Sequence, residues 1–211
     1  MKIFATEFAS FKPSYENPGE APKLPYVDTL FKRRLSQISR MTIDVIHSLI
    51  GENGENSDAK IVFSSFRGEI ARQLKTNRTL FDDAAVMPAS FSISVFNAPP
   101  GLATIVCKMK AGYTAIFPGD GKFSSSLTAA CAGILCGNEK KVIFAYADEL
   151  VPEEYKSSPG YVRPHPLAFA CVLSAERREG ASEIPVGEKE FFKIASSPEA
   201  FLAYLESSQG A

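Results

Sequence analysis

Residues 113–137 have the sequence YTAIFPGDGKFSSSLTAACAGILCG, and the architecture follows from this segment outward. The apolar run Tyr113 to Phe117 predicts a strand, and Pro118-Gly119-Asp120-Gly121 predicts a tight turn. The apolar segment from Lys122 to Cys136 predicts a helix. This order places Asp120 at the apex of the turn, beside the free N–H groups of the first helical turn.

The alternation of strands and helices continues on both sides of this segment. Further strands are predicted at Lys2–Phe8, Lys60–Ser65, Val142–Ala147 and Leu167–Ser174. Helices are predicted at Val27–Ile50, Gly68–Thr76 and Glu188–Leu205, and one helix or a pair at Ser90–Val106, where Pro99 and Pro100 bend or split it. The pattern predicts a layered αβα fold with a mostly parallel sheet, in a single domain covering residues 1–211.

Composition and charge exclude several classes of protein. The chain has 211 residues, 45% of them hydrophobic and 22% charged, as in ordinary globular proteins. Its 23 basic and 24 acidic residues leave a net charge of -1, so no nucleic-acid partner is expected. No apolar run of about 18 residues occurs, so no membrane span is expected. The four cysteines form no C-x-x-C pair and lie in apolar stretches, which favours reduced, buried thiols and a cytoplasmic location.

The chemistry available around Asp120 is limited. An acid at this apex is typical of a turn-forming and helix-capping residue, although an apical Asp or a serine of Ser124-Ser125-Ser126 stays open as a nucleophile. The only histidines, His47 and His165, show no spacing that favours a catalytic dyad or a metal site, so no metal and no cofactor are expected. Asp148-Glu149 follow an apolar strand as acid/base candidates or, more simply, as its solvated exit.

Four blocks of sequence carry a family resemblance. They are FKRRLSQISRM at residues 31–41, FSSFRGE at 63–69, FSISVFN at 91–97 and YADE at 146–149. In this combination the chain resembles the β-ketoacyl-synthase-like N-terminal family, and within it the chain-length-factor-like subunits of aryl polyene pigment systems. The resemblance implies a thiolase-type fold of which this chain holds only the N-terminal half. Complete ketosynthases carry a nucleophilic cysteine in the first half and two catalytic histidines in the second.

The resemblance also implies which residues to compare with a ketosynthase site. An ungapped alignment from Pro88 to the apolar helix puts Asp120 at the position of the nucleophilic cysteine, so no catalytic residue is assigned. Phe96 stands where relatives often carry a histidine. In ketosynthases the residues before the apex strand face a partner subunit and wall its acyl tunnel. Six residues of this chain are therefore candidates for a partner interface or acyl tunnel: Phe91, Ile93, Val95, Phe96, Asn97 and Gly101. Packing in the chain's own core is the equally favoured alternative.

The leading hypothesis is a noncatalytic subunit that pairs with a full-length β-ketoacyl synthase, which acts on chains carried by an acyl carrier protein. The heterodimer would build aryl polyenes by fatty-acid-like or polyketide-like synthesis, and this chain would help to shape the acyl tunnel. One alternative is a small acyl-transfer or hydrolytic enzyme that uses Asp120 or a nearby serine. Another is a purely structural stabiliser of the ketosynthase.

Overall fold

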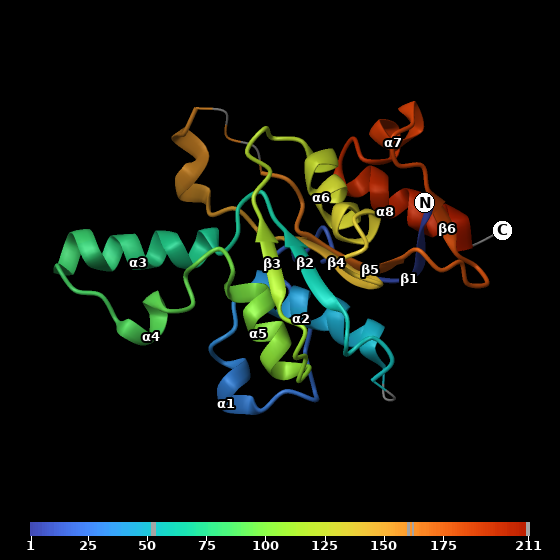
Figure 1. Cartoon of the computed structure of the whole chain (residues 1–211). Coiled ribbons are helices and arrows are strands. Elements are labelled where there is room, and N and C mark those ends of the chain that lie inside the picture. The colour runs from blue at the N-terminus through green and yellow to red at the C-terminus, as the bar shows by residue number, and fades with distance from the viewer. Residues whose placement is uncertain (52–53, 160, 162, 210–211) are drawn as a thin grey trace.

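The computed structural model of the chain describes residues 1–51, 54–159, 161 and 163–209. Within them the strands form one six-stranded sheet in the order β3-β2-β4-β5-β1-β6 (Figure 1). The strands are β1 (Ile3–Phe11), β2 (Lys60–Ser64), β3 (Tyr113–Ile116), β4 (Lys141–Asp148), β5 (Leu167–Ser174) and β6 (Ser182–Ile184). All five predicted strands are present. The three-residue β6 was not predicted, because so short a run has no detectable period.

The sheet is mixed. β3, β2 and β4 pair in parallel, whereas β5 is antiparallel to both β4 and β1, and β6 is antiparallel to β1. Four of the six strands in the described residues therefore run in one direction. The chain between β4 and β5 holds only a short 3-10 helix, η1 (Glu153–Ser157), instead of the α-helix that usually connects parallel strands. The predicted layered α/β fold is confirmed, but the prediction of a mostly parallel sheet is wrong, because three of the five strand pairings in the described residues are antiparallel.

Helices cover both faces of the sheet (Figure 1). On one face lie α2 (Gln37–Ile50) and α5 (Ala98–Val106), and on the other α6 (Phe123–Leu135), α7 (Lys189–Ile194) and α8 (Pro198–Gln209). The remaining helices are α1 (Thr29–Lys32), α3 (Ile70–Asp83) and α4 (Pro88–Phe91). The last two extend away from the sheet in Figure 1.

Each strand contributes side chains to two apolar layers, because successive strand residues point to opposite faces. In β4, Phe144 packs in the α6 layer while its neighbour Ala145 packs in the α2 layer. Phe123 in the first turn of α6 lies at the centre of the α6 layer. Its ring centroid lies 5.6 to 6.1 Å from those of four other aromatic residues, namely Phe144, Tyr146, Phe169 and Phe201.

Two predicted helices are each divided in the structure. The segment Val27–Ile50 forms α1 and α2, because the Ser36 side chain accepts a hydrogen bond from Ser39 N and starts a new helix. The segment Glu188–Leu205 forms α7 and α8, because Ser197 caps the second helix and Pro198 begins it. In both segments the apolar residues continue at helical spacing, but a side-chain cap starts a new helix within the segment.

The structure shows the state of each cysteine and the length of each helix. All four cysteines are unpaired, and Cys131 and Cys171 are buried as predicted. Cys136 is exposed at the end of α6, so the prediction of burial is wrong there, because the last helical turn extends beyond the sheet. Every helix in the described residues is too short or too polar to cross a bilayer.

Phe123→Ala should lower the free energy of unfolding by about 3 to 5 kcal/mol, since it leaves a cavity among four aromatic rings. Urea denaturation followed by circular dichroism measures this loss. The matched control is Phe192→Ala, because Phe192 is 64% exposed and its removal should change stability by no more than about 0.5 kcal/mol. Equal losses in the two variants would contradict the assignment of this core.

Candidate functional site

The turn between β3 and α6 carries Asp120, which is exposed and engaged in local hydrogen bonds. Its Oδ1 accepts from Lys122 N at 3.1 Å and its Oδ2 accepts from Ser125 Oγ at 2.8 Å. The bond from Ser125, followed by that from the Lys122 backbone, holds the pKa of Asp120 below its usual range. This carboxylate is therefore a stable anion that fastens the turn to the first turn of α6.

Among the other candidate catalytic side chains, Ser126 and both histidines have contacts elsewhere in the fold. Ser126 is buried and accepts a hydrogen bond from Ser64 Oγ at 2.7 Å. His47 stacks on Tyr26 with ring centroids 3.6 Å apart, and His165 Nε2 lies 2.7 Å from the carbonyl oxygen of Pro13. Both histidines are thus held by contacts outside the Asp120 turn.

Four of the six predicted interface residues line one open groove of about 400 Å³ between the α4–α5 segment and β3. They are Ile93, Val95, Asn97 and Gly101. The groove follows the first residues of α5, which begins at Asn97 because Pro99 and Pro100 fit only the first turn of a helix. β3 is an edge strand, so the groove lies beside unpaired backbone groups.

The remaining two candidates behave differently from each other. Phe91 is 56% exposed on α4, outside the groove lining. Phe96 points into the chain, with its ring centroid 6.2 Å from those of Phe63 and Phe117. The Phe96 ring packs on Gly68, where a Cβ atom would lie only 2.8 Å from the ring. The φ angle of Gly68 is +56°, a left-handed conformation that also favours glycine. Phe96 is thus half-buried against side chains of this chain, whereas Phe91 is exposed.

The floor of the groove is held by one hydrogen bond and one close approach. Asn97 Nδ2 donates to the Tyr113 hydroxyl at 3.0 Å, which ties the start of α5 to the edge strand. A Cβ at Gly101 would lie 3.2 Å from the same hydroxyl, so glycine allows the tyrosine ring to lie against the helix. The shape of the groove thus depends on a helix and a strand that are fixed to each other.

Two acids at the end of β4 are buried, so their interpretation as a solvated strand exit is wrong. Asp148 is 3% exposed and accepts hydrogen bonds from Ser65 Oγ, from the backbone of Phe66 and Arg67, and from the Tyr146 hydroxyl. The Arg67 guanidinium is 2.9 Å away. Burial raises the pKa of Asp148, against the opposing effects of these partners. Asp148 fixes the turn that leads from β2 toward α3.

Glu149 joins two helices. Its carboxylate accepts from Ala71 N at 3.0 Å and from Ile38 N at 3.4 Å, which are in the first turns of α3 and α2. Burial, followed by the negative charge of Glu69, raises the pKa of Glu149 to about 7. The helix N-termini supply the partial positive charge that a buried carboxylate needs.

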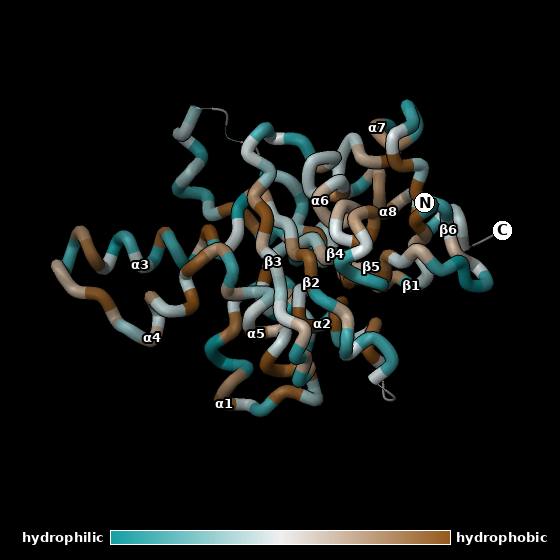
Figure 2. Tube along the Cα trace, in the orientation of Figure 1, coloured by the Kyte–Doolittle hydropathy of each residue, from teal (hydrophilic) through white to brown (hydrophobic). Residues whose placement is uncertain are grey.

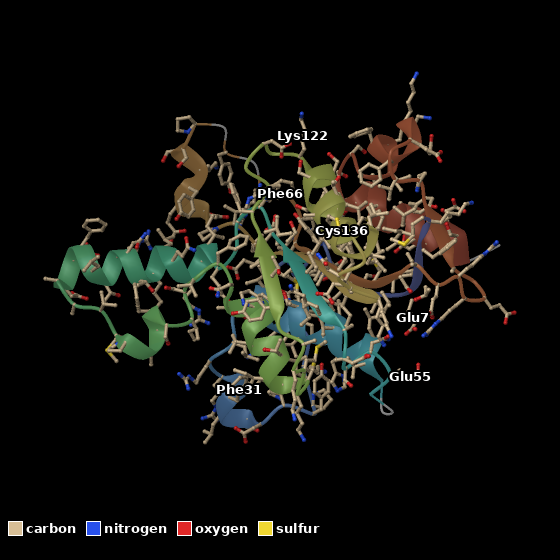
Figure 3. All side chains as sticks on the ribbon, viewed as in Figure 1. Glu7, Phe31, Glu55, Phe66, Lys122 and Cys136 are labelled. Carbon is tan, nitrogen blue, oxygen red and sulfur yellow. The ribbon has the colours of Figure 1, made fainter. Side chains whose placement is uncertain are left out.

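Glu69 completes this network. It is fully buried, and it accepts hydrogen bonds from the Ser36 and Ser39 hydroxyls at 2.7 and 2.6 Å and from Arg72 Nε at 3.1 Å. No sequence pattern singled out this residue except its place in the block FSSFRGE. Figure 3 shows Phe66 and Lys122, from the turns after β2 and β3, at the same end of the sheet. The network therefore holds the end of the sheet from which the Asp120 turn projects.

Residues 9–196 match the family described as beta-ketoacyl synthase, N-terminal domain. The chain belongs to this family. Among the curated proteins no sequence matches it. The matched residues include the Asp120 turn, the groove and the buried acids.

The solved structures that resemble this β-ketoacyl synthase N-terminal domain show the same fold. A chain of a ketosynthase in complex with its chain length factor, from Xenorhabdus doucetiae, has a TM-score of 0.73 at 22% identity, covering 100% of this chain and 93% of that one. The ishigamide ketosynthase/chain length factor gives 0.65 at 14%, with coverages of 85% and 64%. A β-ketoacyl synthase from Burkholderia phymatum gives 0.55 at 13%, with 74% and 46%. The chain thus spans nearly all of the first match and under half of the third, and the predicted thiolase-like N-terminal half is confirmed.

The raised pKa of Glu149 predicts a pH-dependent stability. Between about pH 4.5 and 7 the folded chain keeps a proton that the unfolded chain has lost. The free energy of unfolding should therefore fall as pH rises through this window, by on the order of 3 kcal/mol. Glu149→Gln has no proton to lose and should show a flatter dependence, measured by urea denaturation at about pH 5 and 8. Glu16→Gln, at an exposed site, is the control and should keep the wild-type slope, and the hypothesis is wrong if Glu149→Gln keeps it too.

Proposed function

We propose that this chain is a noncatalytic, chain-length-factor-like subunit that pairs with a full-length β-ketoacyl synthase. In the heterodimer the synthase would condense malonyl units onto a thioester-bound acyl chain carried by an acyl carrier protein. This chain would contribute the groove at α5 and β3 to the wall of the acyl tunnel. The sequence blocks that resemble aryl polyene subunits support polyene synthesis in the cytoplasm as the setting.

The observation that carries the proposal is the state of Asp120. A nucleophile at a strand-to-helix turn must be free to attack and needs a nearby base. Asp120 instead holds its own turn through Lys122 N and Ser125 Oγ, while each histidine is occupied by another partner. An aspartate that is engaged in this way suits a subunit whose partner supplies the nucleophile and the base.

The groove supports the tunnel role. Ile93 and Val95 give it apolar walls, which suit an acyl or polyene chain, and it opens at the edge strand where another subunit has access. Two of the similar structures are assemblies of a ketosynthase with a chain length factor, which supports a heterodimer here. The unpaired thiols suit a reducing compartment.

Co-expression with the β-ketoacyl synthase encoded in the same gene neighbourhood tests the pairing. We expect the two chains to copurify as a stable complex, and Asp120→Ala to keep condensation within about twofold of wild type, because Asp120 is exposed and bonded only within its own turn. Condensation is measured as product formed per complex on acyl carrier protein substrates. An isolated chain that hydrolyses acyl thioesters, and loses this turnover in Asp120→Ala, would instead support the small-enzyme alternative.

The tunnel role predicts a change in product length. Ile93→Ala and Val95→Ala enlarge the apolar groove and should shift the products of the complex toward longer chains, as measured by mass spectrometry of the released chains. The control is Leu135→Ala, a comparable truncation of an exposed side chain on α6 outside the groove, and it should leave the length distribution unchanged. An unchanged distribution in all three variants would favour a purely structural stabiliser.

A further inference from the structure

The end of α3, the connection after it and α4 form an arm, residues 77–92, that extends away from the sheet (Figure 1). Thr76, at the base of the arm, is the one buried side chain among the fourteen residues of α3, and α4 has none. A helix that packs against its own domain normally buries a continuous apolar stripe. The arm therefore receives little cover from the rest of this chain.

The arm nevertheless carries large apolar side chains. Phe81 is 82% exposed, Met87 67%, Phe91 56% and Leu80 47%. Figure 2 shows the corresponding hydrophobic segments at the end of α3 and in the connection to α4. Single exposed apolar residues are common on proteins, but several within a short protruding segment indicate an interaction site.

The total surface of the chain supports this interpretation. Its accessible surface is 11132 Å² at a mass of 22.9 kDa. A compact folded monomer of this mass exposes about 9,600 Å², roughly 1,500 Å² less. A stable protein interface buries about 800 Å² on each partner. The excess is large enough for the groove and the arm to belong to one such interface.

The base of the arm also contains a small pocket that another protein could fill. A slot of about 250 Å³ lies between α3 and α4 and is lined by Lys75, Thr76, Thr79, Val86, Met87, Ala89 and Ser90. The Thr76 hydroxyl at this slot is buried and has no hydrogen-bond partner in the described part of the chain. A large side chain from another protein, with a polar group at its tip, would fill the slot and satisfy this hydroxyl.

The arm is continuous with the groove. Phe91 ends α4, and the next residues lead directly to Ile93 and Val95 in the groove wall. A protein that covers the groove is therefore placed to cover the arm. The end of the arm is negatively charged, because Asp82 and Asp83 are exposed beside Phe81. The nearest basic residue in the sequence, Arg78, forms an ion pair with Glu154 at 2.9 Å.

We infer that the arm is a second docking surface for the β-ketoacyl synthase subunit, an inference that rests on the proposed function. Phe81 and Met87 are its apolar anchors, and they enter an apolar depression on the synthase. Lysine or arginine side chains at the rim of that depression face Asp82 and Asp83. The arm thus extends the interface beyond the groove. It binds the partner and does not contact the substrate.

The test is the affinity of the full chain for the synthase, measured by titration calorimetry. Phe81→Ala and Met87→Ala should each weaken binding about tenfold or more, as for anchor residues of an interface. The matched control is Phe192→Ala, which removes another exposed phenylalanine from α7 and should change the dissociation constant less than about twofold. Because all three side chains are exposed, thermal melting should show that each variant keeps wild-type stability.

A double variant, Asp82→Asn with Asp83→Asn, tests the negative charge at the end of the arm. It should slow association at low salt and match wild type at high salt, since rim charges act mainly on the association rate. If the association rate at low salt is unchanged, the inference that lysine or arginine side chains of the synthase face Asp82 and Asp83 is wrong.

The other outcomes separate the arm from the proposed function. If the synthase binds wild type and Phe81→Ala equally, the arm inference is wrong and the heterodimer stands. If wild type does not bind the synthase, the proposed function fails, and the arm inference with it. If the chain alone forms a dimer that Phe81→Ala converts to a monomer, a second copy covers the arm and the inference is overturned.

Discussion

Asp148 and Glu149, two consecutive buried acids at the carboxyl end of β4, hold the functional end of the molecule together. Asp148 fixes the turn after β2 through Ser65 and Arg67, and Glu149 accepts hydrogen bonds from the first turns of α2 and α3. Buried carboxylates are costly unless fully paired, so each hydrogen bond in this network constrains the position of its donor. One pair of acids thus sets where two helices begin.

The groove and the arm both depend on this network. Its turn includes Gly68, on which the Phe96 ring packs, and Phe96 in turn anchors the segment that leads into the groove. The arm continues from α3, whose first turn donates to the Glu149 carboxylate through Ala71 N.

The chain has the fold of a β-ketoacyl synthase N-terminal half, with an aspartate at the apex of the turn between β3 and α6. Asp120 accepts hydrogen bonds from Lys122 N and Ser125 Oγ, so its carboxylate holds the turn against the start of α6. Beside this turn the structure has a groove at an edge strand and an arm with exposed apolar side chains. Surfaces of this kind suit contact with another protein, as the proposed function requires.

The sequence by itself determined the order of the five longer strands and the turn at Asp120, because these depend on local periodicity and on glycine and proline. The candidate interface residues from Phe91 to Gly101 came from the family resemblance, which local patterns do not supply. Tertiary structure alone decided that Phe96 points inward while Val95 faces the groove, since a period of apolar residues does not say which neighbour covers them. It also decided that Asp148 and Glu149 are buried. Their partners, such as Ser65, Ile38 and Ala71, lie 78 to 111 residues away in the chain, and only the folded sheet brings them together.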